Sequence, residues 1–328
     1  MRAPMLIVGQ GVAGTLLAWE CERAGIEFEI ADAGHASAAS RVGAGIVNPI
    51  TGQRLVKSWQ IDALLGATET TYRGLAEALG IPLIRRMRVW RSFRDADERA
   101  IFHTRWDRGE LVPYARTAAG DAAGFWIEGA LHIDLPGLIS AARRRWLAQG
   151  RLTERRVRLD DERGHRDLVV LCTGAAESRL GAVALDRVKG EALRVTPLEP
   201  LADPEVIRNQ GHWFLPLADG DALVGATYDR AAKDLSPSPA SRALLESSAA
   251  RLLGSARFSV SDHLCGWRTS VRDLRPVTGR FPGEPGFGFI NGLGSKGALY
   301  APWLARQWIN HLTEGVPFAP AVDVARFR

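Results

Sequence analysis

Three glycines near the N-terminus have the spacing of a nucleotide-binding turn. Gly9, Gly11 and Gly14 follow a short apolar run, residues 5–8, and precede a segment of helical periodicity. The first glycine of such a turn permits a tight bend, the second lets a diphosphate approach the backbone, and the third allows close packing of helix on strand. The free N–H groups at the start of the helix then face the negative charge of the phosphates.

An aspartate stands where a nucleotide sugar would lie. A second apolar run, residues 28–31, ends at Asp32, and a carboxylate at that position can accept hydrogen bonds from both hydroxyls of an adenosine ribose. It would repel a 2′-phosphate, which disfavours NADP. An ordinary glycine turn with a surface aspartate is the alternative interpretation.

Three further turns of small residues favour FAD over NAD. A plain NAD dehydrogenase would continue with another strand and helix, whereas this chain continues with the small-residue loop Ser40 to Ile46. The turn Thr173 to Ala175 follows another buried run, and the turn Gly292 to Gly297 precedes the last helical segment. Each can lie against an extended cofactor, and the start of the last helix could stabilise negative charge on a flavin ring.

The elements expected to position these turns alternate between strand and helix. Buried strands are predicted over 5–8, 28–31, 168–172 and 287–290, and helices over 15–24, 61–79, 137–148, 241–253 and from 297 to about 312. Segments 83–93, 125–127, 188–195, 212–217 and 222–227 have the alternation of antiparallel strands. We therefore expect an α/β fold with a discontinuous cofactor-binding domain formed by 1–80, 133–187 and 266–328. Residues 81–132 and 188–265 would form a substrate domain.

Composition is that of an ordinary globular protein. Of the 328 residues, 46% are hydrophobic and 24% charged, and no apolar run approaches the roughly 20 residues of a membrane-spanning helix. The N-terminus has no secretory signal pattern, so a cytoplasmic location is expected. Cys21, Cys172 and Cys265 lie far apart without a CxxC pair, which predicts reduced thiols and neither a disulfide nor a metal site.

The net charge is +5, with the densest group of arginines between residues 143 and 158. We interpret this group as a solvated helix face and edge strand, with contact to nucleic acid as the alternative. Aromatic residues do not interleave with these arginines, which weakens the nucleic-acid alternative.

Several motifs together resemble the D-amino-acid-oxidase-like flavoproteins. This group includes glycine oxidase, sarcosine oxidase and the oxidase half of the enzyme that modifies the wobble uridine of tRNA. Besides the turns already described, the matching motifs are Val188-Lys-Gly190-Glu-Ala-Leu193-Arg194, Gly225-Ala-Thr227, Gly266-Trp-Arg268, Asp273-Leu-Arg-Pro276-Val-Thr-Gly279 and Gly292-Leu-Gly294-Ser-Lys-Gly297-Ala-Leu-Tyr-Ala-Pro302. The resemblance spans nearly the whole chain. It implies a Rossmann-like FAD-binding domain of the glutathione-reductase and D-amino-acid-oxidase type, with an inserted antiparallel-sheet substrate domain.

The resemblance also assigns residues to the cofactor. FAD is expected to bind noncovalently, because Cys265 does not match the attachment positions of the sarcosine oxidases. The residues expected to contact it are Gly9, Gly11, Val12, Ala13, Gly14, Asp32, Ala33, Ser40, Arg41, Gly43, Ala44, Gly45, Ile46, Val157, Thr173, Gly174, Ala175, Gly292, Leu293, Gly294, Ser295, Lys296 and Gly297.

Candidate catalytic residues follow from the same resemblance. Arg268 matches the arginine that holds the substrate carboxylate, with Arg272 and Arg275 as alternatives. Lys296 falls where related enzymes often carry a basic residue near the flavin. His212 and Tyr228 flank the hairpin expected to roof the site, and could shape a pocket or shuttle a proton; ordinary packing is the alternative for each. No catalytic triad is expected, since the cofactor performs the difficult step.

The predicted function is oxidation of the C–N bond of a small amine or amino acid by hydride transfer to flavin N5. Two alternatives remain at this stage. One is a tRNA-modifying FAD oxidoreductase that acts on a carboxymethylaminomethyl-type uridine, and the other is a noncatalytic flavin-binding redox protein. The sequence does not decide between oxygen and another electron acceptor, and it does not predict the oligomeric state.

Overall fold

A parallel sheet begins with the first strand, β1 (Met5–Val8), which lies between β2 (Phe28–Asp32) and β10 (Val169–Leu171). The computed structural model describes residues 4–34, 38–117, 123–162, 164–177, 179–180, 183–254 and 257–327. The sheet has six strands in the order β18-β19-β10-β1-β2-β9. The strands added at its two ends are β9 (Leu152–Glu154), β18 (Val277–Phe281) and β19 (Glu284–Asn291), and β18 alone runs antiparallel to its neighbour.

Both faces of this sheet are covered, which explains the continuous apolar runs of its strands. Side chains alternate along each strand: Ile7 and Ile30 belong to the core on the side of the helices, and Leu6 and Ala31 to a smaller core on the other side. The helices are α1 (Val12–Ala24), α3 (Ile61–Leu79), α5 (Leu135–Ala148) and α8 (Gly297–Glu314). Apolar residues of the short hairpin β11 (Arg179–Leu180) and β12 (Val183–Ala184) and of η2 (Val324–Phe327) complete the smaller core.

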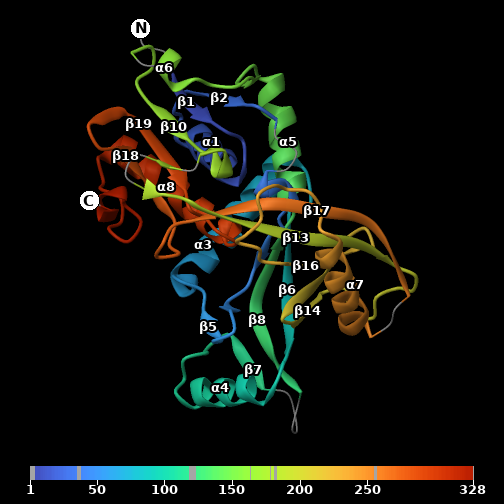
Figure 1. Ribbon diagram of the computed structural model, residues 1–328. Helices are drawn as coiled ribbons and strands as arrows, with labels where there is room; N and C mark the ends of the chain where they lie inside the picture. The colour runs from blue at the N-terminus through green and yellow to red at the C-terminus, as the bar shows by residue number, and fades with distance from the viewer. Residues whose placement is uncertain are drawn as a thin grey trace.

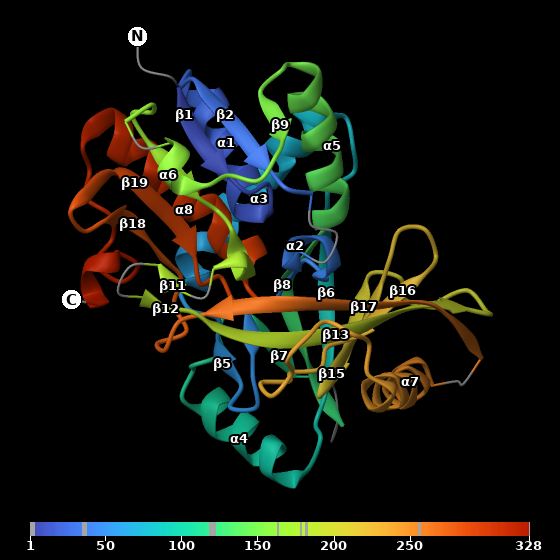
Figure 2. The same ribbon diagram turned by 45° about the horizontal axis from the view of Figure 1, so that its top comes forward.

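A second sheet of nine strands lies below the first in the view of Figure 1. Its order is β17-β13-β16-β15-β14-β6-β8-β3, and β7 pairs with β8. The strands are β3 (Ile46–Val47), β6 (Ile84–Ser92), β7 (Ala115–Thr117), β8 (Gly124–Ile133), β13 (Asp186–Pro197), β14 (Val206–Gln210), β15 (His212–Pro216), β16 (Ala222–Gly225) and β17 (Phe258–Ser270). The long strands β13 and β17 lie side by side and connect the two parts of the molecule (Figure 2).

Two helices pack on this second sheet. The apolar side of α7 (Pro239–Leu253) covers one face through Leu245 and Ala249, which contact Leu193 and Phe214 of the sheet in a separate small core. Helix α4 (Ala96–Asp107) lies at the far end, where the Phe102 ring stacks on Phe125 with 4.3 Å between ring centroids.

The α/β fold is confirmed, and the structure adds details that the sequence patterns did not predict. Helix α4 and strand β17 were not expected, the predicted loop Ser40 to Ile46 begins within α2 (Ala39–Val42), and β4 (Ile50–Thr51) and β5 (Val56–Lys57) follow that loop. The remaining short helices are α6 (Leu159–Glu162) and η1 (Gly174–Ala176). The second sheet is not wholly antiparallel, because β14 and β6 pair in parallel and so join the two inserted segments.

The division into domains remains a prediction, although the predicted boundary between residues 265 and 266 falls inside strand β17. Within the described residues, no helix is both long and apolar enough to cross a membrane.

Candidate cofactor and substrate site

A cleft of about 1100 Å³ separates the two sheets. Its walls include the ends of β1, β2 and β10, at Val8, Ala31 and Cys172, and the facing surface of the nine-stranded sheet. The carboxyl ends of parallel strands are the usual ligand-binding edge of an open α/β sheet. The predicted cofactor turns, represented by Gly9, Ser40, Thr173 and Gly294, all line this one cleft.

The glycine turn at the start of α1 has no room for side chains. A Cβ atom at Gly9 would lie 2.6 Å from the carbonyl oxygen of Cys172, and one at Gly14 would lie 1.9 Å from the carbonyl oxygen of Gly9. Gly11, which has no side chain, precedes the helix, and the N–H of Val12 donates to Ser40 Oγ at 3.0 Å. Gly11, Val12 and Ala13 all line the cleft, so the start of the helix faces it, as the diphosphate of a dinucleotide requires.

Asp32 is held in place at the end of β2. Its carboxylate accepts hydrogen bonds from the backbone N–H of Gln10 and of Gly34 and from Arg143 Nη1, each at 2.8 Å. Burial raises the pKa of Asp32, but these hydrogen bonds and the Arg143 charge outweigh burial, so the pKa lies below its ordinary value. Arg143 also binds Glu154. Sequence reasoning placed Arg143 on a solvated face, and no local signal distinguishes it from its neighbours on α5.

One asparagine connects the remaining turns. Asn291 Nδ2 donates to the carbonyl oxygen of Gly174 at 3.0 Å, and Asn291 Oδ1 accepts from Thr269 Oγ1 at 2.9 Å. The N–H of Gly294 donates to the carbonyl oxygen of Thr269 at 2.7 Å. Since Thr269 follows Arg268 on β17, this network fixes that strand against both turns. Asn291 and Thr269 were not among the predicted site residues.

Arg268 carries an uncompensated positive charge on the cleft wall. Its guanidinium lies against the backbone of Gly190, where a Cβ atom would be 2.2 Å from Arg268 Nη2, and Nη1 donates to the carbonyl oxygen of Thr227 at 3.1 Å. Among the described residues no carboxylate forms an ion pair with Arg268. Burial, partly offset by Tyr228, lowers the pKa of the guanidinium. A partly buried cation without a counter-charge among the described residues is suited to bind an anionic ligand.

Lys296 is a second cation on the cleft wall, at the start of α8. Within the part of the chain described, its ammonium has neither an ion pair nor a side-chain hydrogen bond, and burial lowers its pKa. The N-terminal end of α8 adds partial positive charge at the same place.

The sequence-predicted alternatives to Arg268 lie elsewhere. Arg272 and Arg275 are exposed and do not line the cleft. The Arg275 guanidinium lies 5.6 Å from the centroid of the Trp59 ring. Of the three candidate carboxylate clamps, the structure therefore brings only Arg268 to the cleft.

His212 and Tyr228 do not line the cleft either. Side chains alternate between the two faces of a strand, so Trp213 faces the cleft whereas His212 faces α7, where its Nδ1 lies 2.9 Å from Ser248 Oγ. Tyr228 is 56% exposed, and its ring centroid lies 5.7 Å from the Arg268 guanidinium. Sequence reasoning could place these residues near a hairpin but could not fix which face each side chain takes.

Two predicted cofactor residues support the turns without lining the cleft: Gly14 at the crossing of helix and strand, and Gly292, which has φ of +68°. The other predicted cofactor residues line the cleft: Gly9, Gly11, Val12, Ala13, Asp32, Ala33, Ser40, Arg41, Gly43, Ala44, Gly45, Ile46, Val157, Thr173, Gly174, Ala175, Leu293, Gly294, Ser295, Lys296 and Gly297.

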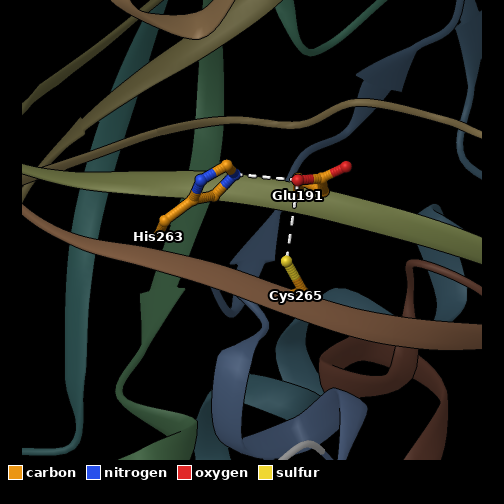
Figure 3. Close-up of side chains that lie close together, drawn as sticks. All are labelled: Glu191, His263 and Cys265. Carbon is orange, nitrogen blue, oxygen red and sulfur yellow. Dashed lines mark hydrogen bonds and ion pairs between the residues drawn. The ribbon is translucent and has the colours of Figure 1, made fainter. Parts of the chain in front are cut away.

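A compact polar cluster joins β13 and β17 (Figure 3). Glu191 Oε2 is 2.8 Å from His263 Nε2 and 3.6 Å from Cys265 Sγ, and these are side chains of metal-binding types. However, the Lys189 ammonium already lies 3.1 Å from Glu191 Oε1, and the N–H of Ser238 donates to Oε2 at 2.9 Å. We interpret the cluster as an ion-pair network that fixes the start of α7; Cys265 does not line the cleft.

Known proteins resemble this chain over nearly its whole length. The family model described as FAD dependent oxidoreductase matches residues 5–309. Glycine oxidase of Pseudomonas aeruginosa is 27% identical, with the alignment covering 98% of this chain and 99% of that protein. The tRNA 5-methylaminomethyl-2-thiouridine biosynthesis bifunctional protein MnmC of Maricaulis maris is 28% identical over 96% of this chain, but only 52% of that longer protein is covered.

Solved structures show the same fold. Glycine oxidase from Geobacillus kaustophilus superposes with a TM-score of 0.77 at 23% identity, covering 99% of this chain and 97% of that one. Iminodiacetate oxidase from a Chelativorans species superposes with a TM-score of 0.76 at 20% identity, covering 97% and 98% of the two chains.

Proposed function

Because the chain belongs to the family of FAD-dependent oxidoreductases, we propose that it oxidises the C–N bond of a small amine that carries a carboxylate. Bound FAD supplies the acceptor for a hydride, a step that amino-acid side chains cannot perform. The task of the protein is then to hold the substrate carbon against the flavin and to keep water away from it.

The observation that carries this proposal is the uncompensated guanidinium of Arg268. A guanidinium binds a carboxylate through two parallel hydrogen bonds, which fixes both the position and the orientation of the substrate. Arg268 is itself fixed, because Gly190 supports its guanidinium and Thr227 accepts its hydrogen bond. Next to it, Ala192, Leu264 and Trp213 give the cleft wall an apolar surface that suits the carbon skeleton of a small amine.

The names of the similar proteins agree with this substrate class. One relative is a glycine oxidase and one structural neighbour is an iminodiacetate oxidase, and both names denote amines that carry a carboxylate. At these identities they support the class of substrate and do not identify it.

The test is anaerobic reduction of the bound flavin. Purified protein should be yellow, and amines that carry a carboxylate should bleach it, whereas the matching amines without a carboxylate should bleach it far more slowly. Arg268→Gln should retain FAD and lose this preference. If no amine or amino acid reduces the flavin, or if NAD(P)H alone does so rapidly, the proposed function is wrong.

Action on tRNA is the second candidate, and the match to half of MnmC favours it. The arginine group between residues 143 and 158 gives it little support, because Arg143, Arg145 and Arg155 are all ion-paired with carboxylates. Tight binding of tRNA that weakens steeply with salt would favour this candidate, and its absence would remove it.

A further inference from the structure

We propose that the cleft contains a second anion-binding position at Arg94, supported by Arg91 and Asn209. The substrates would accordingly carry a second carboxylate on an arm that extends across the sheet from Arg268. This inference rests on the proposed function, and it narrows the substrate class to amines with two acidic groups.

Arg91 and Arg94 carry two positive charges, and the carboxylate that pairs with both of them carries one negative charge. Both arginines line the cleft and both bind the single carboxylate of Glu98. The Glu98 side chain has no exposed surface, the Arg91 side chain is 6% exposed, and the Arg94 side chain is 31% exposed. Asp95 is committed to capping helix α4, where it accepts the N–H of Glu98 at 2.8 Å. Two cations therefore share one anion, and Arg94 is the member that solvent can reach.

The position of Arg94 is fixed by its surroundings. Its backbone N–H donates to Glu98 Oε2 at 2.9 Å, and its Nε lies 3.3 Å from the same oxygen. The aliphatic stem passes Gly211 in the turn between β14 and β15, where a Cβ atom would lie 3.6 Å from Arg94 Cδ. A side chain held in this way loses less conformational entropy when it binds a ligand than a free surface arginine does.

An amide with unmade hydrogen bonds lies beside this pair. Asn209 lines the cleft and is the register partner of Arg91 across the parallel strands β14 and β6. Its Oδ1 is buried without a hydrogen-bond partner among the described residues. A carbonyl oxygen cannot bind an anion, so the contribution of Asn209 would come from its N–H₂ group, which donates to no described residue and can donate to a carboxylate in the cleft.

Strand register connects the two cationic positions. Along one face of the nine-stranded sheet, each residue in a series pairs with the next across neighbouring strands. The series is Leu264, Ala192, Gly225, Trp213, Asn209 and Arg91. Gly225 has no side chain, so the Trp213 indole lies flat over it, 2.8 Å from where a Cβ would stand. Arg268 lies against Gly190 on β13, and Arg94 follows the end of β6, four strand spacings from β13. At about 4.8 Å per spacing this is roughly 19 Å between backbones, so the two arginine side chains and an arm of several bonds must span it together.

The test uses the FAD-loaded protein and ligands that cannot react. The probes are glutarate, adipate and suberate, each compared with the monocarboxylate of equal carbon number, and the dissociation constant is read from perturbation of the flavin absorption spectrum. For at least one chain length the diacid should bind about tenfold more tightly than the monoacid, as expected for one added charge-assisted contact. Arg94→Gln should abolish this difference and leave monoacid binding unchanged.

A matched control is available on β6, the strand that Arg94 follows. Arg88 lies on the opposite face of β6, where its guanidinium stacks on Trp126 and pairs with Glu128. Arg88→Gln removes the same charge from the protein and should leave the advantage of the diacids intact. Retention of bound FAD and a single cooperative melting transition show that Arg94→Gln is folded, even where loss of the pair with Glu98 lowers the melting temperature.

The outcomes separate this inference from the proposed function. If amino acids reduce the flavin and monoacids bind through Arg268, but no diacid binds more tightly than its monoacid, the second position is refuted and the proposed function stands. A diacid advantage that persists in Arg94→Gln also refutes it. If neither amines nor carboxylates affect the flavin, both claims are wrong.

Discussion

At the scale of single residues, Arg268 is a partly buried charge with which no carboxylate of the described residues forms an ion pair. Its removal should therefore have opposite effects on binding and on stability. Arg268→Gln should weaken carboxylate binding by roughly 100-fold, since it removes two charge-assisted hydrogen bonds. The ligand-free protein should be as stable as before or more stable, because the cost of burying the charge disappears. Flavin-monitored titration measures the first effect and urea unfolding the second. Destabilisation by several kcal/mol would instead assign Arg268 a structural role.

The residues around the cleft also predict the pH dependence of turnover. Within the described residues, no histidine or tyrosine lines the cleft, and His212 faces α7. Apart from Lys296 and the carboxylates of the cleft, no described cleft residue could accept the proton, so we expect the amine to bind in its neutral form or to lose its proton to water before hydride transfer. For two substrates whose amines differ in pKa, kcat/KM should rise with pH, and the midpoint of the rise should shift with the substrate pKa. A midpoint that stays near pH 6.5 for both substrates would indicate an enzyme histidine.

Asp32 should matter mainly for the cofactor. Its carboxylate lies in the cleft at the end of β2 and is held by Gln10, Gly34 and Arg143. Asp32→Asn removes one charge-assisted acceptor for a ribose hydroxyl and the ion pair with Arg143, so FAD should bind about 10- to 100-fold more weakly. Quenching of free FAD fluorescence measures this. Unchanged affinity would show that the ribose does not reach Asp32.

The lowered pKa of Asp32 also gives a signed expectation for the flavin-free protein. Because the folded-state pKa lies below the unfolded value of about 3.9, the charged carboxylate contributes stability above that value and loses it as the pH falls through the folded-state pKa. The stability difference between wild type and Asp32→Asn should therefore shrink in acid, which urea unfolding at pH 6 and pH 3 would show. A difference that is equal at both pH values would contradict this.

At the scale of elements, the sequence predicted what is encoded locally. The buried runs, the caps and the glycine turns correctly predicted α1, α3, α5, α7 and α8 and the central strands. Strand β17 was missed because its alternation of partly buried and exposed residues covers only residues 258–261 and breaks at Asp262. Its conformation is imposed by pairing with β13 along its whole length, a contact between distant segments. The parallel pair β6 and β14 is likewise nonlocal and has no local sequence signature.

The close approach of helix α1 to the turn after β1 predicts what a side chain added at Gly14 would do. In Gly14→Ala the new Cβ would stand 1.9 Å from the carbonyl oxygen of Gly9, a backbone atom that cannot move aside without shifting the turn. The variant should lose both stability and FAD binding. Gly66→Ala is the matched control, because Gly66 lies inside α3 and a Cβ added there would have no neighbouring atom within 4 Å. It should be neutral or stabilising by up to about 1 kcal/mol. Equal behaviour of the two variants in thermal unfolding would contradict the packing argument.

At the scale of the whole molecule, the cleft exists only where segments far apart in the sequence meet. The glycine turn could be predicted because strand, turn and helix are consecutive. The second cationic position could not, because Arg94 and Arg268 come from segments whose relation depends on the register of the nine-stranded sheet. The role of Asn291 could not be predicted for the same reason, because its hydrogen bonds join Gly174 to Thr269, two residues that lie far apart in the sequence.

This dependence on distant segments predicts that FAD stabilises the protein as a unit. The cleft is lined by α1, the turn after β10, the start of α8 and the face of the nine-stranded sheet, so an unfolded chain has no binding site for the cofactor. A ligand that binds only the native state adds about 2.7 kcal/mol of stability at a free concentration of 100 times Kd, which raises Tm by several degrees for a chain of this size. Flavin-free protein should therefore melt lower than holoprotein, and its Tm should rise with the logarithm of added FAD.

Riboflavin, which lacks the diphosphate and adenosine, is the control, because it cannot span from the flavin end of the cleft to Asp32 and should stabilise much less. A Tm that does not respond to FAD, or that responds equally to riboflavin, would mean that the adenosine half of the cofactor does not bind along the turn at Gly9.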